Sequence, residues 1–137
     1  MQVGLVGLGR MGSRIRDRLV RGGHQVVAYD QDPAATAVGS IEAVVAALPA
    51  PRVIWVMVPS GAATDAVFAT LEGLVAPGDL LVDGGNSDFR DSIGRATRLQ
   101  ARGIRFLDVG VSGGVYGGER GFCLMAGGSA TDFAVIE

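Results

Sequence analysis

The sequence predicts an α/β fold, in which a mainly parallel β-sheet is covered by helices on both faces. Short apolar runs typical of buried strands alternate along the chain with amphipathic stretches of helical period. A glycine-rich turn, Gly7-x-Gly9-x-x-Gly12, lies between the first apolar run and the first helical stretch. With 137 residues, of which 48% are hydrophobic and 19% charged, the chain suffices for one domain with its own core, residues 1–137.

The strands are predicted from apolar runs that are bounded by glycine, proline or polar residues. The run "VGLVG" is typical of a strand buried on both faces, and the run "RVIWVMV" closes at Pro59. The run "FCLMAGG" indicates a last strand, in which we expect Cys123 to be a core residue. We expect strands over residues 3–7, 25–30, 52–58, 80–83, 104–109 and 122–128.

The helices are predicted from apolar stripes and from start and stop signals. Met11, Ile15 and Leu19 form one stripe of the first helix, which a pair of glycines ends. The second helix is expected to begin with Asp32 as its N-cap and Pro33 at its first position. We expect helices over residues 10–23, 32–38, 62–74, 88–103 and from residue 130 onward.

Composition narrows the class of function. A net charge of −2 offers no broad attraction to nucleic acid or to an anionic membrane surface, so we expect neither partner. The apolar run at the N-terminus is short and broken by glycine, which is typical of neither a signal peptide nor a membrane span. Cys123 is the only cysteine, which excludes an internal disulfide and favours a reducing, cytoplasmic location. No cluster of His, Cys or carboxylate residues has metal-ligand spacing.

The glycine-rich turn matches the fingerprint of dinucleotide-binding domains, and it has the strand-to-helix context that the fingerprint requires. Gly7 permits the tight turn, a bare Gly9 allows close approach of a pyrophosphate, and Gly12 lets the helix pack closely on its strand. The helix N-terminus offers free N–H groups and a partial positive charge to the phosphates. We therefore predict a doubly wound, Rossmann-type domain. Its predicted cofactor-binding turn consists of Gly7, Leu8, Gly9, Arg10, Met11 and Gly12.

Asp30 ends the second predicted strand, 18 residues after Gly12, where an acid accepts hydrogen bonds from the adenosine ribose. Gln31 and Asp32 follow, with no arginine or serine that could hold a 2′-phosphate. A carboxylate beside that phosphate would repel it, so these residues favour NAD over NADP. Asp30 could instead cap the next helix, although Asp32 is better placed to do so.

Five arginines crowd the first predicted helix. Arg10 lies near the phosphate turn, where it could touch the cofactor. The other four are expected to form a solvated face, on which Asp17 and Arg21 make an i,i+4 ion pair.

Two further candidate stretches follow the third and fourth strands, because the carboxyl ends of parallel strands line the ligand crevice. Val58, Pro59 and Ser60 could border the nicotinamide half of the cofactor, although Pro59 is equally well explained as a strand terminator. In "DGGNS", two glycines clear space beside Asn86, whose amide suits a ligand hydroxyl. Asn86 is equally well explained as a turn and N-cap residue, so both interpretations stay open.

Three stretches together resemble one family. "GLGRMG", "DGGNSDFRDS" and "DVGVSGGVYGGERGFCLMAGG" are similar to the N-terminal domain of 6-phosphogluconate dehydrogenase, from Met1 to about Gly128. The "YGGERGFCLM" stretch together with Asp30 resembles the shorter, NAD-preferring bacterial branch. The NADP enzymes of this family carry an Asn-Arg-Ser/Thr run where this chain has Asp30, Gln31 and Asp32.

The resemblance implies a reaction of the pentose phosphate pathway. A hydride leaves C3 of 6-phosphogluconate for the nicotinamide, the 3-keto intermediate loses CO2, and the enediol is protonated to ribulose 5-phosphate. By position, residues 7 to 12 hold the pyrophosphate, Asp30 to Asp32 meet the adenosine ribose, and Val58 to Ser60 flank the cofactor. Asn86 would contact both cofactor and substrate. The substrate's carboxylate and hydroxyl groups would be held by Ser112, Gly113 and Gly114.

The resemblance also implies catalytic groups that residues 1–137 do not supply. The family's lysine base and glutamate proton donor lie on a segment well downstream of the Ser-Gly-Gly loop, which here places them beyond Glu137. All 12 basic residues of this chain are arginines, and neither Glu119 nor Glu137 matches the donor motif. We therefore expect no catalytic residue within residues 1–137, and binding of NAD without turnover by this chain alone.

The family's large helical dimerisation domain would also follow this chain. Truncation before that domain would expose apolar surface near Phe133, Val135 and Ile136. We therefore expect the 137-residue chain to self-associate.

Two other interpretations stay open. The β-hydroxyacid dehydrogenases and imine reductases share the first glycine motif and the Ser-Gly-Gly loop type, but they usually lack the "DGGNS" form. A non-catalytic NAD-binding module is the other alternative.

Overall fold

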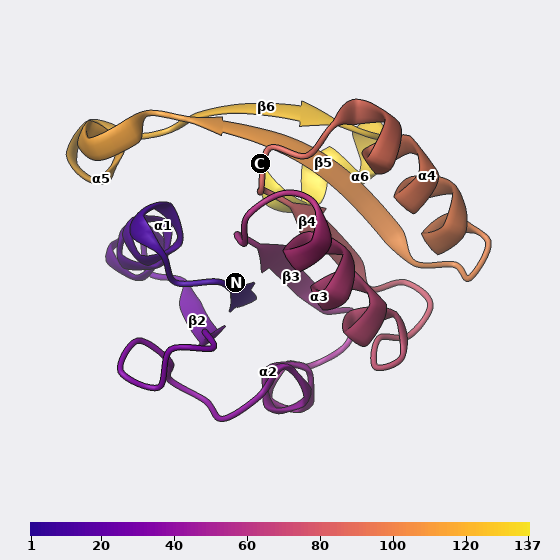
Figure 1. The fold of residues 1–137 in the computed structure, drawn as a ribbon, viewed down its shortest axis with the longest axis horizontal. Coiled ribbons are helices and arrows are strands. Elements are labelled where there is room, and N and C mark those ends of the chain that lie inside the picture. Colours follow the sequence, from indigo (N-terminus) through magenta and orange to yellow (C-terminus); the bar gives the residue numbers. More distant parts are fainter.

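The computed structural model describes the backbone of residues 1–137 and the side chains other than that of Val115 (Figure 1). None of the helices it describes is long and apolar enough to cross a membrane. The strands are β1 (Gln2–Val6), β2 (Gln25–Tyr29), β3 (Val53–Val56), β4 (Leu80–Asp83), β5 (Arg105–Ser112) and β6 (Cys123–Gly127). The helices are α1 (Arg10–Arg21), α2 (Ile41–Ala47), α3 (Ala62–Glu72), α4 (Phe89–Gln100), the 3-10 turn η1 (Gly114–Tyr116), α5 (Gly117–Arg120) and α6 (Ala130–Ile136).

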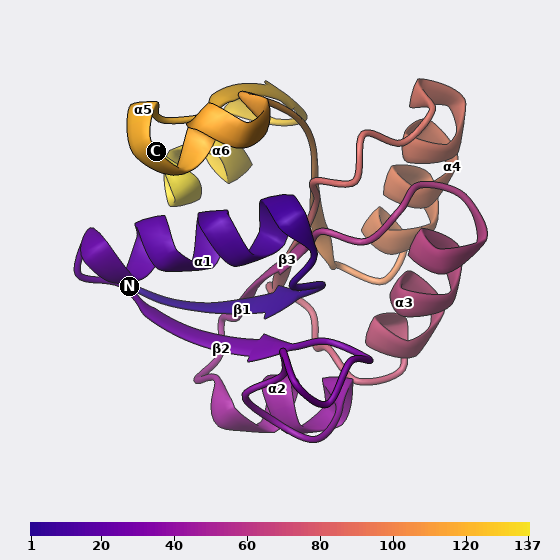
Figure 2. The ribbon, with the colours of Figure 1, turned by 60° about the vertical axis from the view of Figure 1, so that its left-hand side comes forward.

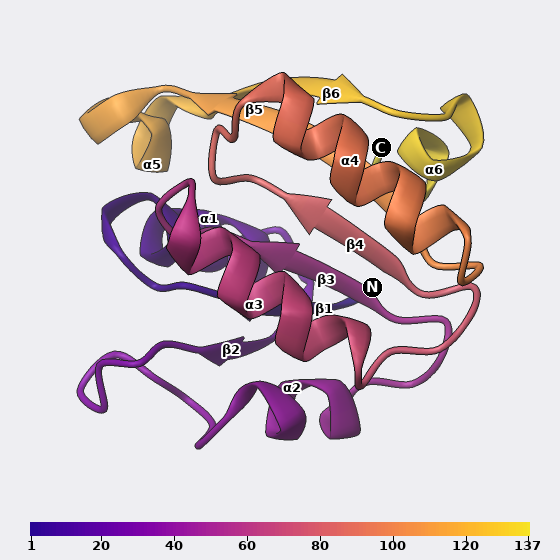
Figure 3. The same ribbon diagram turned by 45° about the vertical axis from the view of Figure 1, so that its right-hand side comes forward.

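All six strands form one sheet in the order β2-β1-β3-β4-β5-β6. The strands from β2 to β5 are parallel to their neighbours, and β6 runs antiparallel to β5 at the edge. The chain goes from β1 outward to β2 and then crosses back to β3, so the strand order reverses at β1 and β3 (Figure 3). In such sheets ligands bind at the carboxyl ends of the strands beside this reversal. The predicted doubly wound, mainly parallel sheet is confirmed.

Helices cover both faces of the sheet, as predicted. Successive residues of a strand point to opposite faces, so Ile54 packs with the core on one side and Trp55 with the core on the other. Figure 2 shows α1 and α2 on opposite sides of β1 and β2. The first core contains buried side chains of α2, α3 and α4, namely Val44, Val45, Phe68, Leu71 and Leu99. The second contains Ile15 of α1, with Met11, Leu19, Val135 and Ile136 packed against it.

The predicted helix over residues 32–38 is wrong. The Asp32 side chain accepts a hydrogen bond from Ala34 N at 3.0 Å, which stabilises a turn instead of a continuing helix. The chain then returns to the sheet, where the amides of residues 37 and 38 both donate to Ala28 O. The helix begins later, at Ile41, with the Ser40 hydroxyl accepting from Ala43 N at 3.1 Å as its N-cap. The sequence therefore did contain the N-cap residue of this helix, Ser40, but it lies eight residues after Asp32, the N-cap that was predicted.

The expectation that Cys123 is a core residue is also wrong. Every residue of β6 is exposed, including Cys123, because this strand lies at the edge of the sheet and pairs only with β5. The register runs from Ser112 opposite Cys123 to Asp108 opposite Gly127. The chain turns back directly after β5 without a long crossover helix, which is why this last pair is antiparallel.

Candidate functional site

Two glycines of the turn between β1 and α1 are required by the protein's own backbone. Gly7 has φ +101°, and a Cβ there would lie 2.5 Å from the carbonyl oxygen of Met57, the residue after β3. A Cβ on Gly12 would lie 2.0 Å from the carbonyl oxygen of Gly7. Both distances are too short for any side chain, so these glycines fix the tight turn and the close approach of α1 to the sheet.

Gly9 differs from its two neighbours in the motif. A Cβ at this position would meet no protein atom within 4 Å, so the protein itself does not require a glycine here. Gly9 is the N-cap of α1, it provides no side-chain cap, and the first turn holds no acidic residue. Ser13 N donates the first hydrogen bond within the helix, to Gly9 O at 3.0 Å. The amides before Ser13 have no acceptor within the helix. This bare, positively polarised end fits a pyrophosphate.

Asp30 joins the turn to the end of β2. Its Oδ2 accepts a hydrogen bond from Leu8 N at 2.6 Å, and its Oδ1 accepts one from Asp32 N at 2.8 Å. Each carboxylate oxygen has a second lone pair, which can accept a ribose hydroxyl. The bond also explains the place of Leu8, whose buried side chain packs in the core while its amide orients Asp30.

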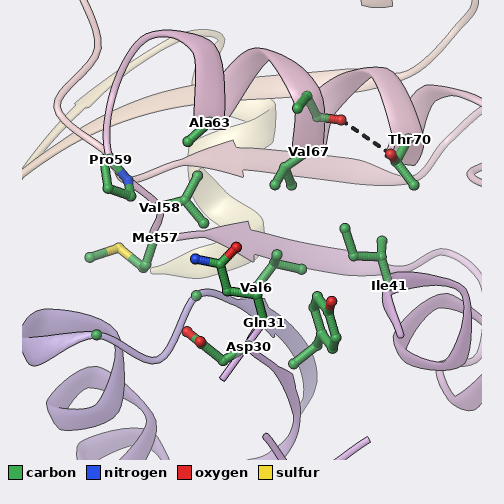
Figure 4. A pocket seen from close by; sticks show the side chains of 14 residues that line it. Val6, Asp30, Gln31, Ile41, Met57, Val58, Pro59, Ala63, Val67 and Thr70 are labelled. Atoms are coloured by element: carbon green, nitrogen blue, oxygen red, sulfur yellow. Dashed lines mark hydrogen bonds between the residues drawn. The ribbon is translucent and has the colours of Figure 1, made fainter. Parts of the chain in front are cut away.

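A cavity of about 500 Å³ lies between the ends of β1, β2 and β3 and the helices α2 and α3 (Figure 4). Six residues predicted to bind the cofactor line it: Gly7, Gly9, Asp30, Gln31, Val58 and Pro59. The other predicted residues do not line this cavity, namely Leu8, Arg10, Met11, Gly12, Asp32, Ser60 and Asn86.

Part of this wall was not found from the sequence. One face of α3 lines the cavity with Ala63, Ala66, Val67 and Thr70, and Ile41 of α2 lies across from it (Figure 4). The α3 residues follow i, i+3, i+4, i+7 spacing, which was a readable signal for a second, small apolar face on that helix. This wall is mostly apolar and suits a flat aromatic ring better than a charged group.

Asn86 joins the fourth and fifth strands beyond the end of their backbone pairing. Its Oδ1 accepts from Val111 N at 2.9 Å, and its Nδ2 donates to Val111 O at 3.3 Å. Asn86 has φ +56°, a left-handed conformation that asparagine tolerates better than most residues. The amide therefore has a structural role in holding "DGGNS" against "GVSGG", and it keeps one N–H and one lone pair for a ligand.

The two glycines of "DGGNS" do not clear space for a ligand, contrary to expectation. A Cβ on Gly84 would lie 2.2 Å from Trp55 Nε1, and a Cβ on Gly85 would lie 2.6 Å from Val58 O. The space beside these glycines is filled by the protein itself. Their absence of side chains lets the loop pack closely on β3.

A buried ion-pair network that the sequence did not reveal holds the same loop. Asp83, fully buried at the end of β4, accepts from Arg95 Nη1 at 2.7 Å and from Ser87 Oγ at 2.6 Å. Arg95 is only 3% exposed, and its Nη2 also donates to Asp65 on α3 at 2.7 Å. Burial raises the pKa of the neighbouring Asp108 carboxyl, and the negative charge of Asp83 raises it further.

Ser112, Gly113 and Gly114 directly follow the Asn86 link. Ser112 is the exposed last residue of β5, and the two glycines have φ +146° and +51°. These are conformations that residues with a side chain rarely adopt. Among the described residues, no group of three or more His, Cys, Asp or Glu side chains could hold a metal ion.

The two glutamates compared with the family's proton donor lie on the last helices of the chain. Glu119 is an exposed residue of α5, and Glu137 is the exposed C-cap of α6, where its amide donates to Phe133 O at 3.1 Å. Neither of them lines the cavity beside the glycine-rich turn. Their positions give no reason to assign either one a catalytic role, so the placement of the family's lysine and glutamate beyond Glu137 stays a prediction.

The structure thus places a dinucleotide turn beside two loops of the kind that the quoted motifs predict. Over residues 2–137, the sequence matches the family described as the NAD binding domain of 6-phosphogluconate dehydrogenase. The chain belongs to this family. The resemblance stated from "DGGNS" and "GVSGG" is confirmed, and the domain is one that binds NAD or NADP.

Relatives of the 6-phosphogluconate dehydrogenase family are longer than this chain. The NAD(+)-dependent, decarboxylating 6-phosphogluconate dehydrogenase of Haloferax volcanii is 42% identical over 137 residues, covering 93% of this chain and 45% of the relative. The chain thus spans about half the length of the first curated relatives it matches.

Solved structures show the same fold. The 6-phosphogluconate dehydrogenase of Plasmodium falciparum superposes with a TM-score of 0.92 at 23% identity, covering 99% of this chain and 32% of that one. The 3-hydroxyisobutyrate dehydrogenase of Mycobacterium tuberculosis superposes with a TM-score of 0.87 at 26% identity, covering 99% of this chain and 49% of that one.

Proposed function

We propose that this chain is the cofactor-binding part of an NAD-preferring 6-phosphogluconate dehydrogenase that oxidatively decarboxylates 6-phosphogluconate to ribulose 5-phosphate. One observation carries the proposal: Asn86 bonds both backbone groups of Val111, the residue before Ser112. This link builds the two substrate-type motifs into one wall at the carboxyl ends of β4 and β5. The 42% identity to the Haloferax volcanii enzyme supports the same activity.

The residues of the chain would bind and orient the two reactants. NAD, when bound, supplies the hydride acceptor. The amides at the start of α1 would hold its pyrophosphate, Asp30 to Asp32 its adenosine ribose, and Val58 to Ser60 would flank it. Asn86 would use its remaining N–H toward the ligands. The substrate's carboxylate and hydroxyl groups would lie on Ser112, Gly113 and Gly114.

The preference for NAD rests on Asp30. Its carboxylate is fixed by two backbone N–H groups at the end of β2, beside the cavity, so it cannot swing away from a 2′-phosphate without losing them. Gln31 and Asp32 add no positive charge there. We expect a lower Kd for NAD than for NADP, measured by isothermal titration calorimetry. The variant Asp30→Ala should reduce the ratio between the two Kd values. Tighter binding of NADP by the unmodified protein would overturn the preference.

The activity is tested on the full-length protein that carries this domain, in which the family's lysine and glutamate would follow Glu137. We expect NADH formation at 340 nm and release of CO2 with 6-phosphogluconate, and no turnover by residues 1–137 alone, which contain no lysine. Turnover by the 137-residue chain would contradict the proposal that the base lies outside it. A cytoplasmic location is part of the proposal, since the substrate and cofactor are metabolites of that compartment.

We further propose that the 137-residue chain self-associates. Leu124 and Met125 lie on the edge strand β6 and are 47% and 59% exposed, and Phe133 on α6 is 42% exposed. Val135 and Ile136, by contrast, pack against the core and contribute less to this surface than expected. Light scattering at high concentration should detect dimers or larger species, and a monomer throughout would contradict this.

A β-hydroxyacid dehydrogenase is the second candidate. The structural match to the 3-hydroxyisobutyrate dehydrogenase of Mycobacterium tuberculosis, at 26% identity, favours it. Comparing kcat/KM of the full-length protein for 6-phosphogluconate and for 3-hydroxyisobutyrate separates the two candidates.

A further inference from the structure

Two arginines of α1, expected to form part of a solvated face, are half-exposed or exposed and also bind the glycine-rich loop. Arg14 Nη1 donates to Gly114 O at 3.2 Å, and Arg21 Nη2 donates to Gly118 O at 2.7 Å. The predicted Asp17–Arg21 ion pair is absent from the pairs found among the described residues, because Arg16 contacts Asp17 instead. Arg14 and Arg21 lie about two helical turns apart, so both reach the loop from one face of α1.

The loop over residues 113–121 contacts the rest of the domain at Gly117 and Gly118, although most of its described residues are exposed. A Cβ on Gly117 would lie 2.2 Å from the ring of Phe122, so this glycine is required for the loop to close over that ring. A Cβ on Gly118 would lie 3.6 Å from the aliphatic stem of Arg14, which shows how near the helix side chain lies. Figure 2 shows α5, which contains these glycines, beside α1.

We propose that Arg14 and Arg21 are positioning residues that fasten this loop to α1. The inference rests on the proposed function, in which the N-terminus of α1 binds the cofactor pyrophosphate and Ser112 to Gly114 hold the substrate. The same helix then supports both reactants. The N-terminus of α1 would bind the cofactor, and the side of the same helix would hold the substrate loop. The distance and orientation between the two binding surfaces would therefore be fixed by one rigid helix.

The physical need for such fastening lies in the glycines themselves. Gly113 and Gly114 have φ +146° and +51°, and a chain of glycines can leave such conformations at little steric cost. The bond from Arg14 fixes the orientation of the peptide group that directly follows the Ser-Gly-Gly run. The bond from Arg21 fixes the loop again one turn later. Without both, the loop samples other conformations and the population competent to bind substrate falls.

The test uses the full-length protein with Arg14→Met and Arg21→Met, singly and combined, and with Arg16→Met as the matched control. Arg16 lies on the same helix and contacts Asp17, not the loop. In the double variant we expect the KM for 6-phosphogluconate to rise roughly tenfold, with kcat changed less and the Kd for NAD unchanged. Arg14→Lys and Arg21→Lys retain a donor and should recover part of the loss. The Arg16→Met control should keep the parental KM.

A second measurement reports the loop directly. Trypsin can cut after the exposed Arg120, and mass spectrometry of the Arg120–Gly121 cut should show faster cleavage in the double variant than in the control. Unchanged cleavage, or equal acceleration by Arg16→Met, overturns the fastening. Faster cleavage with an unchanged KM overturns the positioning role. If the unmodified protein does not oxidise 6-phosphogluconate, the proposed function fails, and the cleavage comparison alone then decides the fastening.

Discussion

The two halves of the site are built in different ways. The turn proposed to face the cofactor is limited by its backbone: side chains at Gly7 and Gly12 would collide with the carbonyl oxygens of Met57 and Gly7. The wall proposed to face the substrate is held by side chains that come from other parts of the chain. Arg95 bonds Asp83 beneath it, Asn86 bonds Val111 within it, and Arg14 bonds the loop after it.

This difference has a physical consequence for how each half responds to change. The turn tolerates no added atom at Gly7 or Gly12, and the Asp30 carboxylate, which accepts from Leu8 N, links it to the end of β2. The wall also leaves no room for a side chain at Gly84 or Gly85, but it depends in addition on buried polar groups, and it fails when one partner is removed and the other is left buried and unpaired. Substitutions can therefore distinguish the two kinds of construction.

The largest effect is expected for Arg95→Met, beneath the substrate wall. The substitution leaves Asp83 fully buried without its cation, which should lower the free energy of unfolding by about 3–5 kcal/mol. Urea unfolding of the 137-residue chain, followed by the fluorescence of its only tryptophan, Trp55, measures this. Arg90→Met is the control on the same helix: Arg90 is exposed and its guanidinium lies over the Phe89 ring, so its loss should cost no more than about 1 kcal/mol. Equal effects of the two variants would contradict the importance of the buried pair.

A somewhat smaller loss is expected for Gly12→Ala in the cofactor turn. The added methyl group would lie 2.0 Å from the Gly7 carbonyl oxygen, so α1 must move away from the sheet, at a cost of roughly 1–3 kcal/mol or more. Gly94→Ala is the matched control, since Gly94 lies inside α4 with no atom within 4 Å of its would-be Cβ. That variant should be stabilised by up to about 1 kcal/mol. The same urea experiment measures both, and a neutral Gly12→Ala would show that the turn is not limited by its backbone.

Gly9→Ala should separate folding from binding within the same turn. Since no protein atom lies near the new methyl group, the free energy of unfolding should change by less than about 1 kcal/mol. The methyl group would occupy the approach of the pyrophosphate, so the Kd for NAD should rise at least about tenfold. Calorimetric titration with NAD, beside urea unfolding, tests this. An unchanged Kd would mean that the pyrophosphate does not lie over Gly9.

The same difference explains how much could be predicted from the sequence. The roles of Gly7 and Gly12 follow from a short motif, because sterics at a tight turn leave few alternatives. Arg95 looks like any arginine on an amphipathic helix, and nothing local indicates that its partner lies on β4. The partner of Arg14 is 100 residues away in the sequence. The false helix at residues 32–38 has a related cause, since Asp32 and Pro33 suit a turn as well as a helix start.

The smallest effect is expected for Asp108→Asn, beside the buried pair in the substrate half. Burial and the negative charge of Asp83 raise the pKa of the Asp108 carboxyl in the folded protein above its unfolded value. The folded state therefore holds this proton more tightly, and stability falls as the pH rises from the unfolded pKa through the folded pKa. Asparagine does not titrate, so the free energy of unfolding of the variant, relative to the parent, should increase across that pH range and then level off. The gain should be well below the loss in Arg95→Met, because Asp108 remains partly solvated.

Urea unfolding of the parent and of Asp108→Asn at a series of pH values measures this difference, with Asp91→Asn as the control. Asp91 is an exposed carboxyl in the first turn of α4, where a negative charge is favourable, so its removal should give no such gain. A difference for Asp108→Asn that does not change with pH would show that burial and the charge of Asp83 do not raise the pKa of the Asp108 carboxyl in the folded protein.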